Sequence, residues 1–323
     1  MAPQKNSRSS GSEPGQTELS QPPGATASDL LTMSLRARTR RLLQLFDLRP
    51  RKSLSQNFLI DDAAAEALAQ AVDQHSNPDT LIIEIGAGLG ALTVPLANLG
   101  RELVGFETDK HLIPPLQLLT EPFANVAVRH CDITKEDLGN FAPGRRLAVV
   151  GNLPYHITGL LLRRLMEIGH RCDIIIATVQ TEVAQRLAAG PGDEQYGVLS
   201  VFAHYYLGRV EMLRRLGPGA FLPRPDVDSA ALALHPLPDP AKAAGLNAQQ
   251  EELLFRTIKA AFAHRRKTLR NSIAMSDHLD ITKSELDEAL ADAGVDGACR
   301  GEELDVQDFV RLAVAIDSVT EGQ

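Results

Sequence analysis

The order of apolar and polar positions predicts an α/β fold in the middle of the chain. Short apolar runs, which are typical of buried strands, occupy residues 81–85, 102–106, 126–130, 147–150 and 173–179. Stretches rich in Ala and Leu lie between several of these runs and are typical of helices. Because alternating strands and helices are typical of parallel sheets, we expect a doubly wound, Rossmann-like sheet. Two later runs, at residues 201–210 and 229–234, are predicted to form a hairpin that closes the sheet edge.

The chain before the sheet divides into two segments. Residues 1–32 are rich in Ser, Gly, Pro and Gln and contain few large apolar residues, so we predict a disordered tail. Residues 33–52 are basic, and their apolar positions predict an amphipathic helix from Leu35 to Leu48 that ends before a proline. The sheet domain is then expected to span residues 53–236.

A helical domain is predicted after the sheet. The Pro-rich segment 235–240 is typical of a hinge, and residues 241–323 follow it. Thr282 and Glu285 have the spacing of a capping box at a helix start, and residues 310–316 are typical of a terminal helix. The expected fold class is therefore α/β, with a small C-terminal all-α domain.

Composition and cysteine spacing narrow the class of protein. The chain is 44% hydrophobic and 23% charged, which is ordinary for a soluble globular protein. No apolar run approaches the length needed to cross a bilayer, so we expect no membrane partner. Cys131, Cys172 and Cys299 lack paired spacing, which argues against a disulfide framework or a zinc site and favours a reducing, cytoplasmic location. We therefore expect no metal.

Charge is unevenly distributed along the chain. The formal net charge is −8, but between Asp277 and Asp308 eleven acidic residues accompany only two basic ones, so the remainder is nearly neutral. Basic residues gather in two clusters, which are Arg36, Arg38, Arg40, Arg41, Arg49, Arg51 and Lys52, and then Arg265, Arg266, Lys267 and Arg270. Such clusters fit a polyanion such as RNA, and the alternative is that they are solvated helix faces.

The tetrapeptide Asn152-Leu153-Pro154-Tyr155 follows the predicted strand at residues 147–150. Open α/β sheets place their ligand crevices at the carboxyl ends of strands. The Asn152 amide and the Leu153 carbonyl can accept hydrogen bonds from an amino group on a flat ring, Pro154 stiffens the backbone, and the Tyr155 ring can stack. The alternative interpretation is a strand-to-turn junction with a buried tyrosine.

A glycine-rich loop follows the first predicted strand. Gly86, Gly88 and Gly90 allow sharp backbone turns and close approach of a ligand, and Glu107 ends the next predicted strand at about the distance typical of a ribose-binding acid. The G-x-G-x-G spacing differs from that of a pyrophosphate-binding loop, so a cofactor without a diphosphate, such as S-adenosylmethionine (SAM), fits it. Asp132 ends the third strand and either accepts a hydrogen bond from an adenine or caps a helix.

Two uncharged amides precede the sheet. Gln56 and Asn57 flank Phe58 and Leu59 after a run of basic residues. They are interpreted as a cover over a cofactor, and the alternative is that they cap the helix expected to start near Asp61.

Six motifs occur in the order of one known family. They are residues 53–59 (SLSQNFL), 84–90 (EIGAGLG), 152–155 (NLPY), 196–200 (YGVLS), 221–229 (FLPRPDVDS) and 265–271 (RRKTLRN). Together they resemble the small-subunit (16S) ribosomal RNA adenine N6,N6-dimethyltransferases of the KsgA/RsmA type. The resemblance covers roughly residues 49–315 and implies a class I SAM-dependent methyltransferase domain.

The resemblance implies roles for the residues around the cofactor. Gln56, Asn57, Leu59, Gly86 and Gly88 would line SAM. Glu107 would hold its ribose and Asp132 its adenine.

The resemblance also implies roles around the target base. Asn152 would face both the methyl donor and the target amine, with the Leu153 carbonyl as a second acceptor. Tyr155 and Phe221 would cover the two faces of the target adenine.

The activity implied is dimethylation of two adjacent adenosines near the 3′ end of small-subunit rRNA, coupled to biogenesis of the 30S particle. The C-terminal helices, with Arg265, Arg266, Lys267 and Arg270, would dock on the rRNA, and a cytoplasmic monomer is expected. Two alternatives stay open, namely a large-subunit rRNA adenine methylase of the macrolide-resistance type and a non-catalytic assembly or transcription factor on the same fold. The motifs at residues 196–200 and 265–271 favour the small-subunit activity.

The sequence departs from the family pattern at four positions. Ser55 replaces a usual glycine, Thr181 and Asp226 stand where lysines are common, and Val198 replaces a frequent arginine. Fewer cations predict weaker phosphate contacts and a smaller salt dependence of RNA binding.

Overall fold

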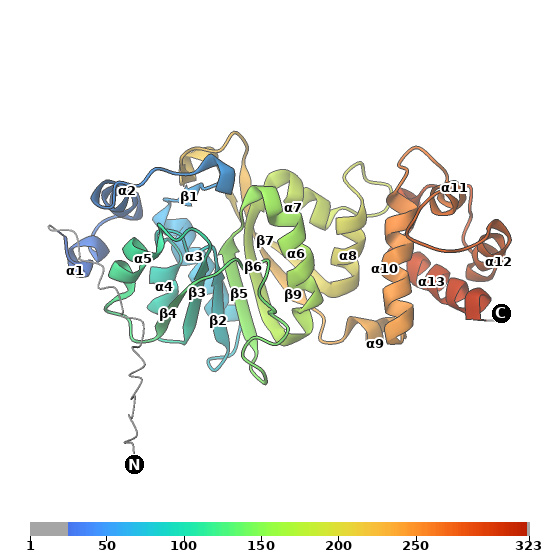
Figure 1. The fold of residues 1–323 in the computed structure, drawn as a ribbon, viewed down its shortest axis with the longest axis horizontal. Coiled ribbons are helices and arrows are strands. Elements are labelled where there is room, and N and C mark those ends of the chain that lie inside the picture. Colours follow the sequence, from blue (N-terminus) through green and yellow to red (C-terminus); the bar gives the residue numbers. More distant parts are fainter. Residues whose placement is uncertain (1–24, 322–323) are drawn as a thin grey trace, which may run out of the picture.

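A seven-stranded sheet forms the centre of the protein, and the computed structural model describes residues 25–321 around it (Figure 1). In their order across the sheet, the strands are β4 (Val126–His130), β3 (Leu103–Glu107), β2 (Leu81–Ile85), β5 (Leu147–Asn152), β6 (Cys172–Gln180), β9 (Ser229–Pro236) and β7 (Leu207–Leu216). The first five are parallel, whereas β9 and β7 are antiparallel to their neighbours. The predicted Rossmann-like sheet is confirmed, and so is antiparallel pairing at its edge.

Helices cover both faces of the sheet. The helices that connect or flank the strands are α3 (Asp62–His75), α4 (Thr93–Ala97), α5 (Ile113–Thr120), α6 (Thr158–Glu167), α7 (Thr181–Ala188) and α8 (Val198–Tyr206). Val150 packs into the apolar cluster that contains α3 and α4 residues, and its neighbour Val149 packs into the cluster that contains α6 and α8 residues. Because alternate side chains enter opposite cores, the central strands are apolar at nearly every position.

One predicted strand was wrong. Residues 198–206, which overlap the strand predicted at 201–210, form helix α8, and β7 begins only at Leu207. The run is rich in β-branched and aromatic residues, which favour strands. However, Val201, Phe202 and Tyr205 are all buried, and this spacing places them on one helical face. At the helix start, the Ser200 hydroxyl accepts a hydrogen bond from the Gly197 backbone.

The predicted disorder of residues 1–32 was wrong for its last part, and residues 1–24 lie outside the described chain. Helix α1 (Ala27–Leu31) begins with a capping box between Thr26 and Asp29, and Leu30 is fully buried. Leu30 belongs to an apolar cluster with residues of α5 and of helix α2 (Leu35–Leu45). Tertiary burial therefore stabilises a segment whose average composition predicts disorder.

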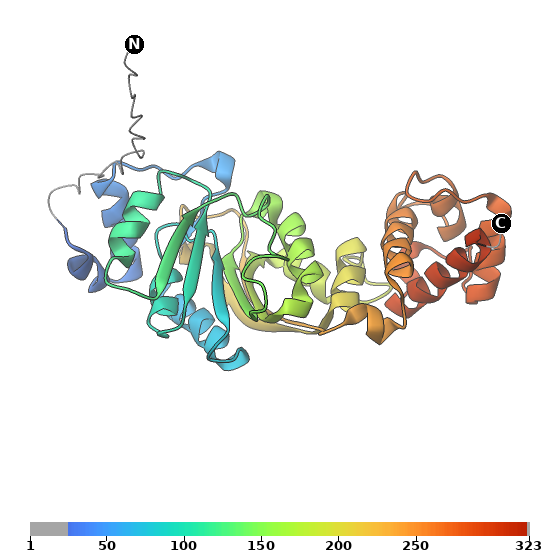
Figure 2. The same cartoon turned by 60° about the horizontal axis from the view of Figure 1, so that its bottom comes forward.

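The C-terminal helices lie at one end of an elongated molecule, beyond α8 (Figure 2). They are α9 (Pro240–Ala244), α10 (Ala248–Phe262), α11 (Leu269–Ala274), α12 (Lys283–Ala293) and α13 (Val306–Glu321). The capping box at Thr282 and Glu285 is confirmed. Buried residues of α8 belong to one continuous apolar cluster with those of α10 and α13, and Tyr196 donates a hydrogen bond to the Leu304 carbonyl at 2.8 Å. Among residues 25–321, no helix has the length and apolar character of a membrane span.

Short elements complete the fold. Strands β1 (Phe58–Leu59) and β8 (Phe221–Leu222) form a separate two-stranded antiparallel sheet. The 3-10 turns are η1 (Lys52–Leu54), η2 (Tyr155–Ile157), η3 (Gly169–Arg171), η4 (Pro218–Ala220) and η5 (Gly301–Glu303).

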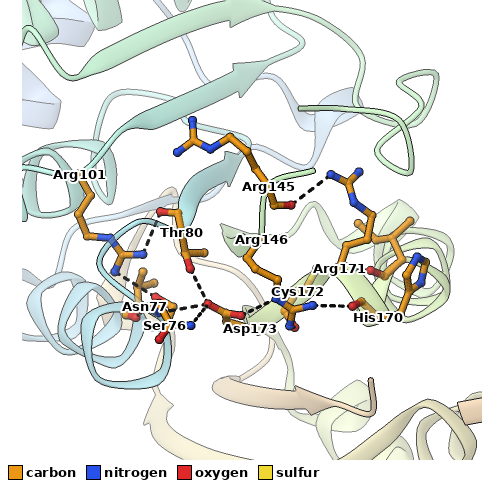
Figure 3. A network of polar contacts seen from close by, with 12 residues as sticks. Ser76, Asn77, Thr80, Arg101, Arg145, Arg146, His170, Arg171, Cys172 and Asp173 are labelled. Carbon is orange, nitrogen blue, oxygen red and sulfur yellow. Dashed lines mark hydrogen bonds and ion pairs between the residues drawn. The ribbon is translucent and has the colours of Figure 1, made fainter. Parts of the chain in front are cut away.

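A polar network joins segments at the amino ends of the parallel strands (Figure 3). Asp173 accepts hydrogen bonds from the Thr80 hydroxyl at 2.5 Å, the Asn77 backbone at 3.1 Å and Arg146 Nε at 2.7 Å. Arg146 also donates to the carbonyls of His170 and Cys172, both at 2.6 Å. We call these six residues the amino-edge network. It ties the start of β2 to the starts of β5 and β6.

Candidate active site

A cavity of about 270 Å³ opens at the carboxyl ends of β2, β3 and β5. Its wall includes all of the predicted cofactor-binding residues and the tetrapeptide, which are Gln56, Asn57, Leu59, Gly86, Gly88, Glu107, Asp132, Asn152, Leu153, Pro154 and Tyr155. The structure therefore brings together, in one pocket, residues that lie almost a hundred positions apart in sequence. This is the position at which doubly wound sheets bind ligands.

The glycine loop forms the floor of the pocket because its backbone adopts conformations that side chains disfavour. Gly86 has a φ of +71° and Gly88 a φ of +56°, both in the left-handed region. A Cβ on Gly88 would also contact the Phe58 ring at 3.5 Å. Any larger residue at these positions would strain the loop and narrow the cavity.

Two buried glutamates support this loop. Glu107 accepts hydrogen bonds from the Gly88 and Asp109 backbones, both at 2.8 Å, and burial raises its pKa despite these bonds. Glu84 is 1% exposed and accepts a hydrogen bond from the Thr93 hydroxyl at 2.6 Å. Burial, with a smaller contribution from Glu107, raises the pKa of Glu84 to about 7. Sequence reasoning gave Glu84 no role, although an acid within the apolar strand at residues 81–85 was a signal.

Asn152 presents a buried hydrogen-bond acceptor without a partner. Its Nδ2 donates to the Asn57 carbonyl at 2.8 Å, which fixes the orientation of the amide. Its Oδ1 is buried and has no hydrogen-bond partner among residues 25–321. Since buried polar atoms are nearly always paired, a lone acceptor in the wall of a pocket indicates a place for a donor from a ligand.

The Tyr155 side chain lies on the same wall and is fixed at its hydroxyl. The Tyr155 hydroxyl and the Ser229 hydroxyl share a hydrogen bond at 2.7 Å. Burial raises the pKa of the Tyr155 phenol, so the ring stays neutral at physiological pH. A neutral aromatic ring that is fixed at its hydroxyl can stack face to face against a flat base.

Asp132 occupies a more polar part of the pocket. Its Oδ1 accepts hydrogen bonds from the Thr134 hydroxyl at 2.7 Å and the Thr134 backbone at 3.1 Å, and its Oδ2 lies 3.6 Å from Lys135 Nζ. The Thr134 hydroxyl bond contributes most to lowering the pKa of Asp132. The carboxylate is therefore charged and can accept a further donor.

The segment around Gln56 lies across the pocket and is clasped at two points. Gln56 Nε2 donates to Asp109 Oδ2 at 2.9 Å, and Gln56 Oε1 accepts from the Arg51 backbone at 2.8 Å. Ser55 has a φ of +49°, and its hydroxyl shares a 3.0 Å hydrogen bond with His156 Nδ1. The polar bonds hold this cover in place, whereas the Ser55 backbone conformation opposes it.

Phe221 does not line this pocket, and its place over the target base stays a prediction. Phe221 is 1% exposed and packs into the apolar cluster that also contains Leu59, Leu216 and Ala220. Pairing of β8 with β1 places Phe221 opposite Leu59 and turns its ring into the core. Sequence spacing cannot reveal this burial because it depends on a pairing across 160 residues.

The predicted RNA-binding cluster lies in the loop after α10 and is only partly available. Arg265, Arg266 and Lys267 are exposed, whereas Arg270 donates to both carboxylate oxygens of Asp287, with Nη2 2.6 Å from Oδ2. Arg270 is thus paired with Asp287 on α12, and its contact with phosphate stays a prediction. In Figure 1 this loop and the cover segment before β1 lie at the same side of the molecule.

Comparison with known proteins agrees with the pocket and the fold. The family model of the ribosomal RNA adenine dimethylases matches residues 48–317. The chain belongs to this family. Among curated proteins similar to this chain is "Ribosomal RNA small subunit methyltransferase A" of Bacillus pumilus. It is 37% identical over 284 residues, and the alignment covers 85% of this chain and 94% of that protein. The protein of the same name from Alkaliphilus metalliredigens is 35% identical over 85% of this chain and 95% of its own length.

Solved structures show the same fold at lower sequence identity. A dimethyladenosine transferase from Plasmodium falciparum has a TM-score of 0.67 at 21% identity, covering 81% of this chain and 98% of that chain. The 23S rRNA methyltransferase ErmE has a TM-score of 0.60 at 24% identity, covering 81% of this chain and all of that chain. The class I methyltransferase fold with C-terminal helices is thereby confirmed.

Proposed function

We propose that this protein dimethylates the N6 atoms of two adjacent adenosines near the 3′ end of small-subunit rRNA, using SAM as the methyl donor. Membership of the ribosomal RNA adenine dimethylase family supports the reaction. The names of relatives at 35–37% identity, which align over more than nine-tenths of their length, support the small subunit as the target. The likeness to ErmE, at 24% identity, supports the fold but not a large-subunit target.

The observation that carries the proposal is the unpaired Asn152 Oδ1 in the pocket wall. An adenine amino group has two hydrogens to donate. Asn152 Oδ1 accepts one and the Leu153 carbonyl accepts the other. These bonds draw the amino lone pair out of the ring, so that N6 becomes a better nucleophile. Stacking on Tyr155 orients the base, and such positioning accounts for on the order of 7–11 kcal/mol in well-aligned reactions.

The remaining wall fits SAM by the chemistry of its donors and acceptors. Glu107 is the acceptor for ribose hydroxyls, Asp132 for an adenine amino group, and the glycine loop lets the ligand approach the backbone. When bound, SAM supplies a methyl group activated by a sulfonium. Gln56 and Asn57 cover it and exclude water, and Asn57 also holds the Asn152 amide in place.

The exposed cations of the loop after α10 are proposed to contact the rRNA backbone. Arg265, Arg266 and Lys267 are the members of the predicted cluster that the structure leaves exposed. Because phosphate contacts release counterions, replacing these three residues should weaken rRNA binding and reduce its salt dependence.

Mass spectrometry of rRNA digests from cells that lack the gene tests the proposal. We expect dimethyladenosine in small-subunit rRNA to disappear, to return with a wild-type copy and not to return with Asn152→Ala. Normal dimethyladenosine in the small-subunit rRNA of the deletion strain would overturn the proposal. Loss confined to large-subunit rRNA would assign the enzyme to the other subunit.

A further inference from the structure

Two histidines and a glutamate meet at the sheet edge opposite the pocket. His75 ends helix α3, Glu211 lies in β7 and His235 lies in β9. One ligand atom from each residue lies within 4.8 Å of the others, and all three side chains are partly buried. The His75 and His235 rings are 5.1 Å apart, edge to face. We call these residues the His/Glu cluster.

One edge of a metal coordination site is already formed in this cluster. His235 Nε2 lies 3.3 Å from Glu211 Oε2. Two ligands of a tetrahedral Zn²⁺ with bonds near 2.0–2.1 Å lie about 3.3 Å apart. All three ligand atoms lie within 4.8 Å of one another, so shifts on the order of 1 Å would bring them to zinc-binding distance, and rotation of the imidazole rings about their side-chain bonds can supply such shifts.

An arginine marks the place of positive charge in the cluster. Arg209 Nη2 lies 3.0 Å from His235 Nε2 and 2.6 Å from Glu211 Oε2. The imidazole nitrogen and the carboxylate oxygen therefore both face a positive charge. The Arg209 side chain is 59% exposed, so it can swing into solvent at little cost. The Arg209 guanidinium therefore occupies the position that a metal ion bound to the same imidazole and carboxylate would take.

We propose that His75, Glu211 and His235 bind a divalent transition metal of the Zn²⁺ class, with Arg209 as a displaceable internal cation. Two imidazoles and one carboxylate are a recognised zinc ligand set, and they leave a fourth position for water. The sequence offers no such signal, because the three ligands come from positions 75, 211 and 235 and only the fold assembles them. The expectation of no metal rested on cysteine spacing alone.

The position of the cluster predicts what the metal does. Helix α3 begins beside the pocket and runs for 14 residues, so His75 lies about 20 Å from that start. A metal there would clamp the end of α3 to the antiparallel strands β7 and β9. We therefore expect metal binding to stabilise the fold and to leave methyl transfer unchanged. The inference does not rest on the proposed function.

The test is titration of the EDTA-treated, dialysed full chain with Zn²⁺ by isothermal calorimetry. We expect one Zn²⁺ per chain and at least about tenfold weaker binding in His75→Ala and in His235→Ala, because each removes one of three ligands. Arg209→Ala should bind Zn²⁺ more tightly, because the competing cation is gone. Zn²⁺ should raise the melting temperature of the wild type and not that of the His75→Ala/His235→Ala double variant.

His170→Ala, which removes an exposed histidine outside the cluster, is the matched control and should bind Zn²⁺ like the wild type. The absence of saturable binding would overturn the proposal. Equal binding by His75→Ala, His235→Ala and the wild type would also overturn it, and would assign the signal to adventitious surface sites. If the alanine variants fail to fold, Arg209→Ala decides alone, since weaker or unchanged affinity there contradicts displacement.

Discussion

Two polar side chains, Asp173 and Asn152, lie at opposite ends of the same parallel sheet and differ in how their oxygens are paired. At the amino end, Asp173 accepts bonds from Thr80, Asn77 and Arg146. Burial opposes the effect, but the bonds from Thr80 and Arg146 hold the pKa of Asp173 below its ordinary value. At the carboxyl end, Asn152 Oδ1 has no partner among residues 25–321.

The pKa values of buried carboxyl groups at the carboxyl end also differ in direction from that of Asp173. Burial raises the pKa of Glu84 to about 7 and raises that of Glu107, so in both groups the charged form is disfavoured. The difference indicates a division of labour along the strands. The amino end stabilises the fold, and the carboxyl end gives up stability to keep acceptors for a ligand.

Replacing Asn152 should have the largest effect on activity and little effect on stability. Asn152→Ala removes the acceptor for the target amine, and losing such a bond in a reacting complex lowers kcat by roughly 10²–10³-fold. Methyl transfer to undermethylated small subunits, measured with labelled SAM, checks this together with urea unfolding. Asn125→Ala is the matched control, because Asn125 Nδ2 donates to the carbonyls of Ala97 and Arg101 at the amino end. The control should lose stability and keep its kcat, and equal loss of kcat in both variants would contradict the division of labour.

Replacing Asp173 should produce the reverse pattern. Asp173→Ala leaves Arg146 and Thr80 without their shared carboxylate, whose side chain is only 10% exposed, so we expect a loss of about 3 kcal/mol in the free energy of unfolding. The kcat per folded molecule should stay unchanged. Glu102→Ala, which breaks the exposed ion pair with Arg145 nearby, should cost under about 1 kcal/mol. A similar cost for the two variants would show that the amino-edge network is an ordinary surface feature.

Glu84 makes the contrast visible as a pH dependence. The folded protein holds the Glu84 proton more tightly than the unfolded chain, so stability falls as pH rises from the ordinary pKa of 4.5 through about 7. Glu84→Gln removes this loss while keeping an acceptor for Thr93. Relative to the wild type, it should therefore be more stable at pH 8 than at pH 5, by at most about 3 kcal/mol. Urea unfolding at both pH values measures the difference, and an equal effect at the two values would show that Glu84 ionises freely.

The sequence predicted most reliably those features that depend on local pattern. The five parallel strands are apolar at nearly every position because both faces are buried, and strand ends with unusual residues, such as Gly86 and Asn152, indicated the pocket. It failed where distant packing decides. The run at 201–210 is helical up to Tyr206, where its buried face packs on α6 and α10, and Arg270 pairs with Asp287 because α12 lies beside it. The spacing of residues within either segment does not indicate these contacts.

The cover over the pocket gives the smallest expected effect and shows how finely the carboxyl end is balanced. Ser55 stands where the family pattern has glycine, and its left-handed backbone costs about 1 kcal/mol, offset by the hydrogen bond to His156. Ser55→Gly relieves the strain and removes the bond, so its net effect on stability should be under about 1 kcal/mol. His156→Ala should weaken SAM binding in the wild type and have no further effect in the Ser55→Gly background. A double-mutant cycle of SAM affinity, measured by calorimetry, isolates this coupling. A coupling of zero would mean that the clasp at Gln56 alone holds the cover, because the Ser55–His156 bond would then contribute nothing to the bound state.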